Sequence, residues 1–183
     1  MTVKEVVIAA ANLVGCAESV QAYLDGQNNV GETETNALVR AFNMVESELA
    51  LDFIPLLVEE KQKVVGGKVA YASLTKKLAR IVEARDLDGR KLAFETFPTA
   101  LRVKAKEVIV QYAYLPEEKG LEDGVEYESR VSKALLAYGV AEAYCGSRGL
   151  YAEARFWEKK YKAQLTEACG KNRGGRIRAR VWV

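Results

Sequence analysis

The segment RIRARVWV, residues 176–183, combines residue types and a spacing that suit binding to a partner. Arginine guanidinium groups form paired hydrogen bonds with carboxylates and phosphates, and tryptophan is a frequent anchor in a partner's pocket. In an extended segment, successive side chains point to opposite faces, so the aliphatic residues share one face and the arginines share the other with the tryptophan. The candidate partner-binding residues are Arg176, Ile177, Arg178, Arg180, Val181, Trp182 and Val183.

Three interpretations of this segment are open. It is a solvated tail without order, a tail whose arginines contact DNA phosphates, or a strand that docks on a partner's sheet edge or groove. The two-residue alternation favours the docking strand, because contacts with phosphates do not require an aliphatic face. The preceding residues 171–175, KNRGG, are polar and glycine-rich, as expected of a flexible tether.

The rest of the chain lacks the usual residues of catalytic and metal sites. It contains no histidine, which is the commonest general base and metal ligand near neutral pH. The segment VVGGK, residues 64–68, has neither the spacing of a phosphate-binding loop nor a helix expected after it. No pair of carboxylates is singled out for acid–base work. We therefore predict no enzyme activity, no catalytic residue, no metal and no cofactor.

Three cysteines, Cys16, Cys145 and Cys169, are too widely spaced to suggest a zinc site or a disulfide framework. We predict small, buried, reduced thiols and an intracellular origin. The opening residues are typical of a helix rather than a signal peptide. No apolar run reaches the roughly 18 residues that a membrane span requires.

Length and charge limit the remaining classes. The 183 residues suffice for one domain with a core, and 49% hydrophobic with 28% charged residues is a globular balance. The formal net charge of +2 is too small for nucleic-acid binding over the whole surface. Any basic character must therefore be local.

Apolar residues at helical spacing predict four helices, and the elements between them are extended. Thr2-x-x-Glu5 has the pattern of a capping box, Gly15 is a weak point in the first helix, and Gly146 and Gly170 are expected to end the last two. The aromatic residues Tyr138, Trp157 and Tyr161 could form a cofactor site, but their helical spacing favours core packing. The predicted helices cover about 2–24, 33–52, 127–146 and 149–169.

Between the second and third helices, residues from about 53 to 115 read as a small, mainly antiparallel sheet. Residues 107–114 alternate in the two-residue period of a strand, and Gly66-Gly67 and Asp88-Gly89 mark turns. The predicted class is thus α+β, with a four-helix body, a sheet inserted between helix 2 and helix 3, and an extended C-terminal tail. We assign residues 1–169 to one domain and 170–183 to the docking tail.

An acidic, turn-rich loop follows the sheet, PEEKGLEDGVEYE at residues 116–128. Clustered carboxylates can bind a divalent cation, but this loop lacks the ligand order of a calcium site. A solvated loop or a charged contact between subunits fits better.

Three passages of the chain give it a resemblance to a known family. They are the opening helices with their short loop, the strand VIVQYAYLP (108–116) with the acidic loop after it, and LLAYGVAEAYCGSRGLYAEARFWEKKYKAQL (135–165). In this order of elements, over nearly its whole length, the chain resembles the head–tail adaptor, or connector, proteins of tailed bacteriophages.

The resemblance implies a structural protein of the virion neck, made in the bacterial host cytoplasm. Members of this family form a ring, commonly of twelve copies, beneath the portal and connect the capsid to the tail. The implied partners are the portal protein, the next neck or tail protein (stopper, tube or hub) and further copies of the chain itself. Genomic DNA passes through the lumen without being read, and no membrane is involved. The alternative is a small cellular DNA-binding or regulatory protein with a basic C-terminal arm.

Overall fold

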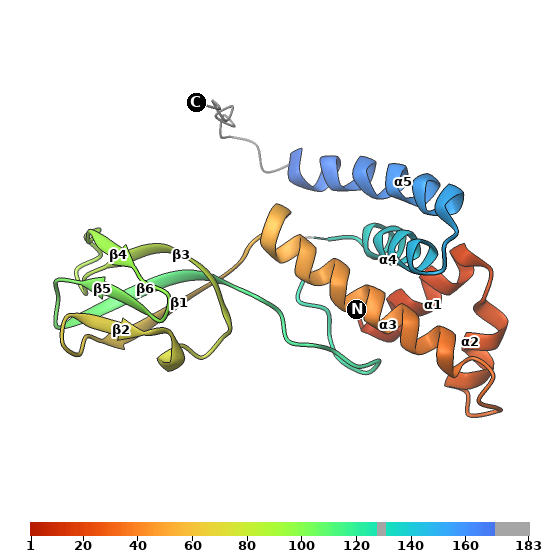
Figure 1. Cartoon of the computed structure of the whole chain (residues 1–183), viewed down its shortest axis with the longest axis horizontal. Helices are drawn as coiled ribbons and strands as arrows, with labels where there is room; N and C mark the ends of the chain where they lie inside the picture. Colours follow the sequence, from red (N-terminus) through yellow and green to blue (C-terminus); the bar gives the residue numbers. More distant parts are fainter. Residues whose placement is uncertain (128–130, 171–183) are drawn as a thin grey trace. The chain divides into compact units, whose positions relative to one another are not determined.

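The computed structural model describes residues 1–127 and 131–170, and the contacts divide the chain into two compact units. The helical unit combines Met1–Glu46 with the chain from Glu118 onward, and the β unit is Ser47–Glu117. Within the described residues there are five α-helices and two three-stranded antiparallel sheets (Figure 1). The predicted α+β class is therefore confirmed, whereas the predicted four-helix body is not.

The first predicted helix, 2–24, is in fact two helices. Helix α1, Val3–Val14, begins at Thr2, whose side chain accepts a hydrogen bond from the Glu5 N–H as the capping pattern predicts. It ends at Gly15, which has φ +77° and donates its N–H to the Ala11 carbonyl. Helix α2 then covers Ala17–Leu24. The chain breaks here because glycine adopts a left-handed conformation without steric cost.

The second predicted helix, 33–52, changes type before it ends. Helix α3 is α-helical over Glu32–Glu48, and the turn Leu49–Phe53 is π-helical. The Ile54 N–H donates to the Leu49 carbonyl at 2.7 Å. These residues are five positions apart, which is the hydrogen-bond spacing of a π-helix. Pro55 follows, and the residue before a proline is disfavoured in helical geometry.

The last two helices lie side by side in the helical unit and run antiparallel, as their short connection predicts (Figure 1). Helix α4, Lys133–Ser147, begins six residues later than predicted, where the Ser132 side chain accepts from the Leu135 N–H at 3.1 Å. Helix α5 is Tyr151–Gly170. Gly149, with φ +75°, takes the left-handed conformation that we expected of Gly146, which remains helical.

The core of the helical unit is built from apolar stripes that the sequence shows. Helix α1 buries Val3, Val6, Val7, Ala10 and Ala11, and α3 buries Leu38, Phe42 and Val45 among others. Of the predicted aromatic stripe, Tyr161 is buried, and Tyr138 and Trp157 are partly buried with their rings stacked 5.8 Å apart. The core interpretation is therefore correct for Tyr161, whereas Tyr138 and Trp157 stack on each other and stay partly exposed.

The β unit contains two antiparallel sheets, with strand orders β1-β6-β3 and β2-β5-β4. The strands are β1 (Leu56–Lys63), β2 (Lys68–Ala70), β3 (Leu78–Arg85), β4 (Phe94–Thr96), β5 (Ala100–Val103) and β6 (Glu107–Tyr114). Both sheets contribute to one core, formed by Val69, Ala84, Leu101, Val103, Val108, Val110 and Tyr112. The alternation read in residues 107–114 corresponds to the central strand β6, whose Val108, Val110 and Tyr112 are buried.

The turn at Gly66-Gly67 is present, but the two strands beside it do not pair along their length. Both glycines have positive φ, and Val65 and Lys68 exchange two backbone hydrogen bonds at 2.9 and 3.1 Å. Beyond this bridge, β1 joins β6 and β2 joins β5, so the turn connects the two sheets. Strand β5 was not anticipated, because its four residues are too few to show an alternation.

Candidate functional site

The predicted partner-binding residues, Arg176, Ile177, Arg178, Arg180, Val181, Trp182 and Val183, lie outside the described residues. The docking-strand interpretation therefore stays a prediction. Among the described residues, the helical unit contains two further candidate features, a buried ion pair and an exposed apolar surface.

The acidic loop after the sheet is held against the helical unit by specific contacts. The Val3 N–H donates to the Asp123 carbonyl at 3.0 Å, and the Lys4 N–H donates to the Leu121 carbonyl at 2.9 Å. These bonds satisfy backbone donors at the start of α1 that no residue within the helix can satisfy. No cluster of three or more His, Cys, Asp or Glu side chains that could hold a metal ion occurs among the described residues.

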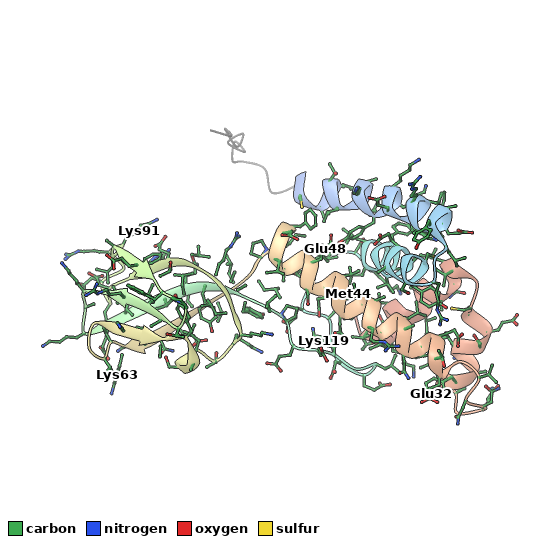
Figure 2. All side chains as sticks on the ribbon, viewed as in Figure 1. Glu32, Met44, Glu48, Lys63, Lys91 and Lys119 are labelled. Atoms are coloured by element: carbon green, nitrogen blue, oxygen red, sulfur yellow. The ribbon has the colours of Figure 1, made fainter. Side chains whose placement is uncertain are left out.

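Helix α3 holds the same loop from the other side. The Asn43 side chain accepts from the Lys119 N–H at 2.9 Å and donates to the Lys119 carbonyl at 3.0 Å. One turn further along, the Glu46 carboxylate accepts from the Lys119 Nζ at 3.1 Å and from the Glu126 N–H at 3.0 Å. The Glu46 side chain is completely buried, and its second oxygen, Oε2, has no hydrogen-bond partner among the described residues. Figure 2 labels Lys119 in this loop.

Burial raises the pKa of the Glu46 carboxyl, and this effect outweighs the bonds from the Glu126 N–H and Lys119, which lower it. We did not identify this residue from the sequence. A signal was present, since Glu46 follows Phe42 by four residues and so falls on the apolar stripe of α3. The arrangement therefore fastens the acidic loop to helix α3 through Asn43 and Glu46.

The three cysteines are free thiols in different surroundings. Cys145 is buried, whereas Cys16 and Cys169 are only partly buried, so the prediction of burial is correct for one of them. Burial raises the pKa of Cys16 and of Cys145, with nearby carboxylates adding to the effect. Both thiols are therefore held in the protonated, weakly nucleophilic form.

A hydrophobic surface lies where α4 turns into α5. Leu150, Tyr151 and Phe156 are 46%, 70% and 52% exposed, although each is a large apolar or aromatic side chain. Leu150 and Phe156 help to line a groove of about 480 Å³; its lining residues are Leu13, Val14, Cys145, Leu150, Ala152, Glu153, Phe156 and Trp157. The Phe156 and Trp157 rings meet edge to face, with their centroids 4.8 Å apart. Such exposed clusters are typical of surfaces that another molecule covers.

No protein-family model matches the chain, and a search of curated proteins finds no significant match.

No helix among the described residues combines the length and the hydrophobicity that crossing a membrane would require.

Proposed function

We propose that this protein is a head–tail adaptor of a tailed bacteriophage: a structural, non-enzymatic ring component of the virion neck. In this proposal, copies of the chain assemble below the portal, extend the DNA channel and bind the next neck or tail protein. The three sequence passages described above support the family. The observation that best supports assembly of copies into a ring is the exposed apolar surface of the helical unit around Leu150, Tyr151 and Phe156.

This surface is suited to contact between copies. Its three exposed side chains follow one another closely at the start of α5, on a helix packed firmly against α4. A rigid support keeps the entropic cost of ordering an interface low. Aromatic side chains are enriched at the centres of protein interfaces, where they contribute most of the binding energy. In the proposed ring, a neighbouring copy covers Tyr151 and Phe156.

Electron microscopy of the full chain mixed with the portal protein of the same genome tests the proposal. We expect additional ring density on one end of the portal. Portal rings that stay bare, together with a chain that binds a particular DNA sequence, would instead indicate the cellular regulator.

A pair of matched variants tests the contact surface. Tyr151→Glu places a charge in the surface and is expected to prevent assembly on the portal, because an unpaired charge is costly to bury in an interface. Val30→Glu is the control, since Val30 is similarly exposed in the helical unit but lies in the loop before α3. Circular dichroism should show that both variants keep their helices. Assembly of Tyr151→Glu at the level of Val30→Glu would contradict the proposed contact.

A further inference from the structure

The β unit carries an open groove lined by lysines. Its volume is about 680 Å³. The lining residues are Lys61, Gln62, Lys63, Val65, Lys68, Ala70, Ala72, Ser73, Thr99 and Ala100, which we call the lysine groove. The lining thus combines three ammonium groups, two hydroxyl groups and small alanine side chains, and it includes no carboxylate. Ammonium groups are donors that suit phosphate oxygens.

Side-chain hydrogen bonds between β1 and the segment 71–75 hold the lining of this groove in place. The lining residues Gln62 and Ser73 are hydrogen-bonded to each other: the Ser73 Oγ donates to the Gln62 Oε1 at 3.1 Å, and the Gln62 Nε2 donates to the Ser73 carbonyl at 3.3 Å. Beside them, Glu60 accepts bonds from the Thr75 N–H, the Thr75 hydroxyl and the Tyr112 hydroxyl. The segment 71–75 is therefore fixed to β1, and the groove exists before any ligand binds.

The lysines of the groove are only partly neutralised. Lys61 pairs with Glu107 at 3.0 Å, whereas Lys63 forms no ion pair with any described residue. The Lys68 ammonium lies 5.8 Å from the centre of the Phe97 ring. Both Lys63 and Lys68 are exposed, so their charges are available to a ligand (Figure 2 labels Lys63).

Strand pairing brings further cations to the same end of the β unit. Lys68 lies directly opposite Arg102, and like charges in that position destabilise a sheet. Arg102 is partly compensated by Glu95 at 3.5 Å. The Val64 N–H donates to the Lys106 carbonyl, which places the segment 104–106 beside the end of β1. Lys104 and Lys106 are exposed and have no ion-pair partner among the described residues.

Charge is therefore segregated within the β unit. Segments 61–68 and 102–107 hold six cations and one carboxylate, a net charge of +5, while the remainder of Ser47–Glu117 holds six cations and nine carboxylates, a net charge of −3. The net charge of the whole chain hides this local concentration. A basic surface of this kind, with a concave centre, attracts a polyanion and raises its local concentration.

We propose that the lysine groove and the adjoining basic end bind the phosphate backbone of double-stranded DNA without sequence preference. Lysine neutralises phosphate as a point charge, and the groove lining holds no arginine for paired bonds to guanine and no aromatic ring for stacking on single-stranded bases. The choice of DNA as the polyanion rests on the proposed function, in which the genome passes through the ring.

Fluorescence anisotropy of the full chain with a labelled random-sequence duplex, measured over a series of salt concentrations, tests this proposal. The variant Lys63→Gln/Lys68→Gln should bind about tenfold more weakly near 0.1 M salt, and the slope of log K against log salt should fall by about 2, because each lost phosphate contact removes about 0.9. The control Lys77→Gln/Arg90→Gln removes two exposed cations of the same unit outside the groove. It should retain nearly the wild-type slope.

Equal weakening of the two variants would overturn the proposal, because it would show that only the net charge matters. Undetectable binding of the wild-type chain would overturn it as well. A difference between the variants on vesicles containing anionic phospholipid, with no difference on DNA, would assign the groove to lipid headgroups instead. Assembly on the portal is measured separately. A ring that forms although the chain does not bind DNA would contradict only the proposal that the lysine groove binds DNA. DNA binding by a chain that forms no ring on the portal would contradict only the proposed adaptor function.

Discussion

At the scale of single residues, the most unusual environment in the helical unit is that of Glu46. A fully buried carboxylate is rare unless it is paired, and here one oxygen accepts from Lys119 and a backbone N–H, while the other has no partner in the part of the chain that the structure describes. Removing either partner of a buried ion pair usually costs more than the pair contributes, because the remaining charge is left uncompensated. The pair therefore makes the position of the acidic loop specific more than it makes the fold stable.

The raised pKa of Glu46 predicts a dependence of stability on pH. The folded state binds the carboxyl proton more tightly than the unfolded chain, so the contribution of Glu46 is fully present below the ordinary pKa of 4.5 and decreases as pH rises through the higher pKa of the folded state. We expect the free energy of unfolding of the wild type, relative to Glu46→Gln, to decrease as pH rises above the ordinary pKa of 4.5. Urea denaturation across this range measures the difference.

Glu32→Gln is the matched control, since Glu32 is an exposed carboxylate on the same helix (Figure 2). The same urea series on this variant gives the reference for removing a carboxylate from the surface of α3. A wild type that gains stability over Glu46→Gln as pH rises would show that the hydrogen bonds outweigh burial and would contradict the prediction.

At the scale of elements, the packing of α4 depends on Gly139. A Cβ atom at this position would lie 2.9 Å from the Val45 Cγ1 of α3 and 3.0 Å from the Tyr161 Cε2 of α5. Real Cβ contacts are longer, so the absence of a side chain is what lets three helices approach one another here. This glycine lies in the passage YGVAEAYC, one of those that carry the resemblance to adaptor proteins.

We expect Gly139→Ala to destabilise the helical unit by about 1–3 kcal/mol, the usual cost of overpacking a core. Gly146→Ala is a close control, because Gly146 lies in the same helix and has nothing within 4 Å of its Cβ position. There, alanine should be neutral or stabilising by up to about 1 kcal/mol, since it favours the helix. Thermal unfolding followed by circular dichroism compares them, and equal melting temperatures would exclude the close approach.

At the scale of the whole molecule, the proposed adaptor has separate surfaces for separate partners. The helical unit carries the apolar surface around Tyr151, the β unit carries the lysine groove, and the segment 176–183 carries the predicted docking strand. In a ring, many weak contacts act together, so each copy needs only a modest affinity for the portal.

The docking strand is tested by variants that keep every arginine. Ile177→Ser/Val181→Ser removes two members of the aliphatic face without changing the net charge. Because burying one such side chain contributes about 1.5–3 kcal/mol and the variant removes two, affinity for the portal should fall at least about a hundredfold per copy in an equilibrium binding assay. Deletion of residues 171–183 should abolish binding. Portal binding by the double variant that equals the wild type would favour a DNA-contacting or solvated tail.

The features that the sequence determined by itself are local elements of secondary structure. The stripes of α1, α3 and α5, the cap at Thr2 and the alternation of β6 are set by side-chain periodicity and by hydrogen bonds between near neighbours. The mixed α+β class followed from these patterns.

Only the tertiary structure decided how distant segments meet. The two strands beside Gly66-Gly67 separate into different sheets because β1 pairs with β6 and β2 pairs with β5, 30 or more residues further along the chain. Glu46 is buried because Lys119 and the Glu126 N–H, supplied by a loop more than 70 residues away, compensate its charge. The lysine groove arises in the same way, since strand pairing gathers cations that lie apart in a chain of nearly balanced charge. Such contacts depend on packing and burial across long sequence separations, which no local period encodes.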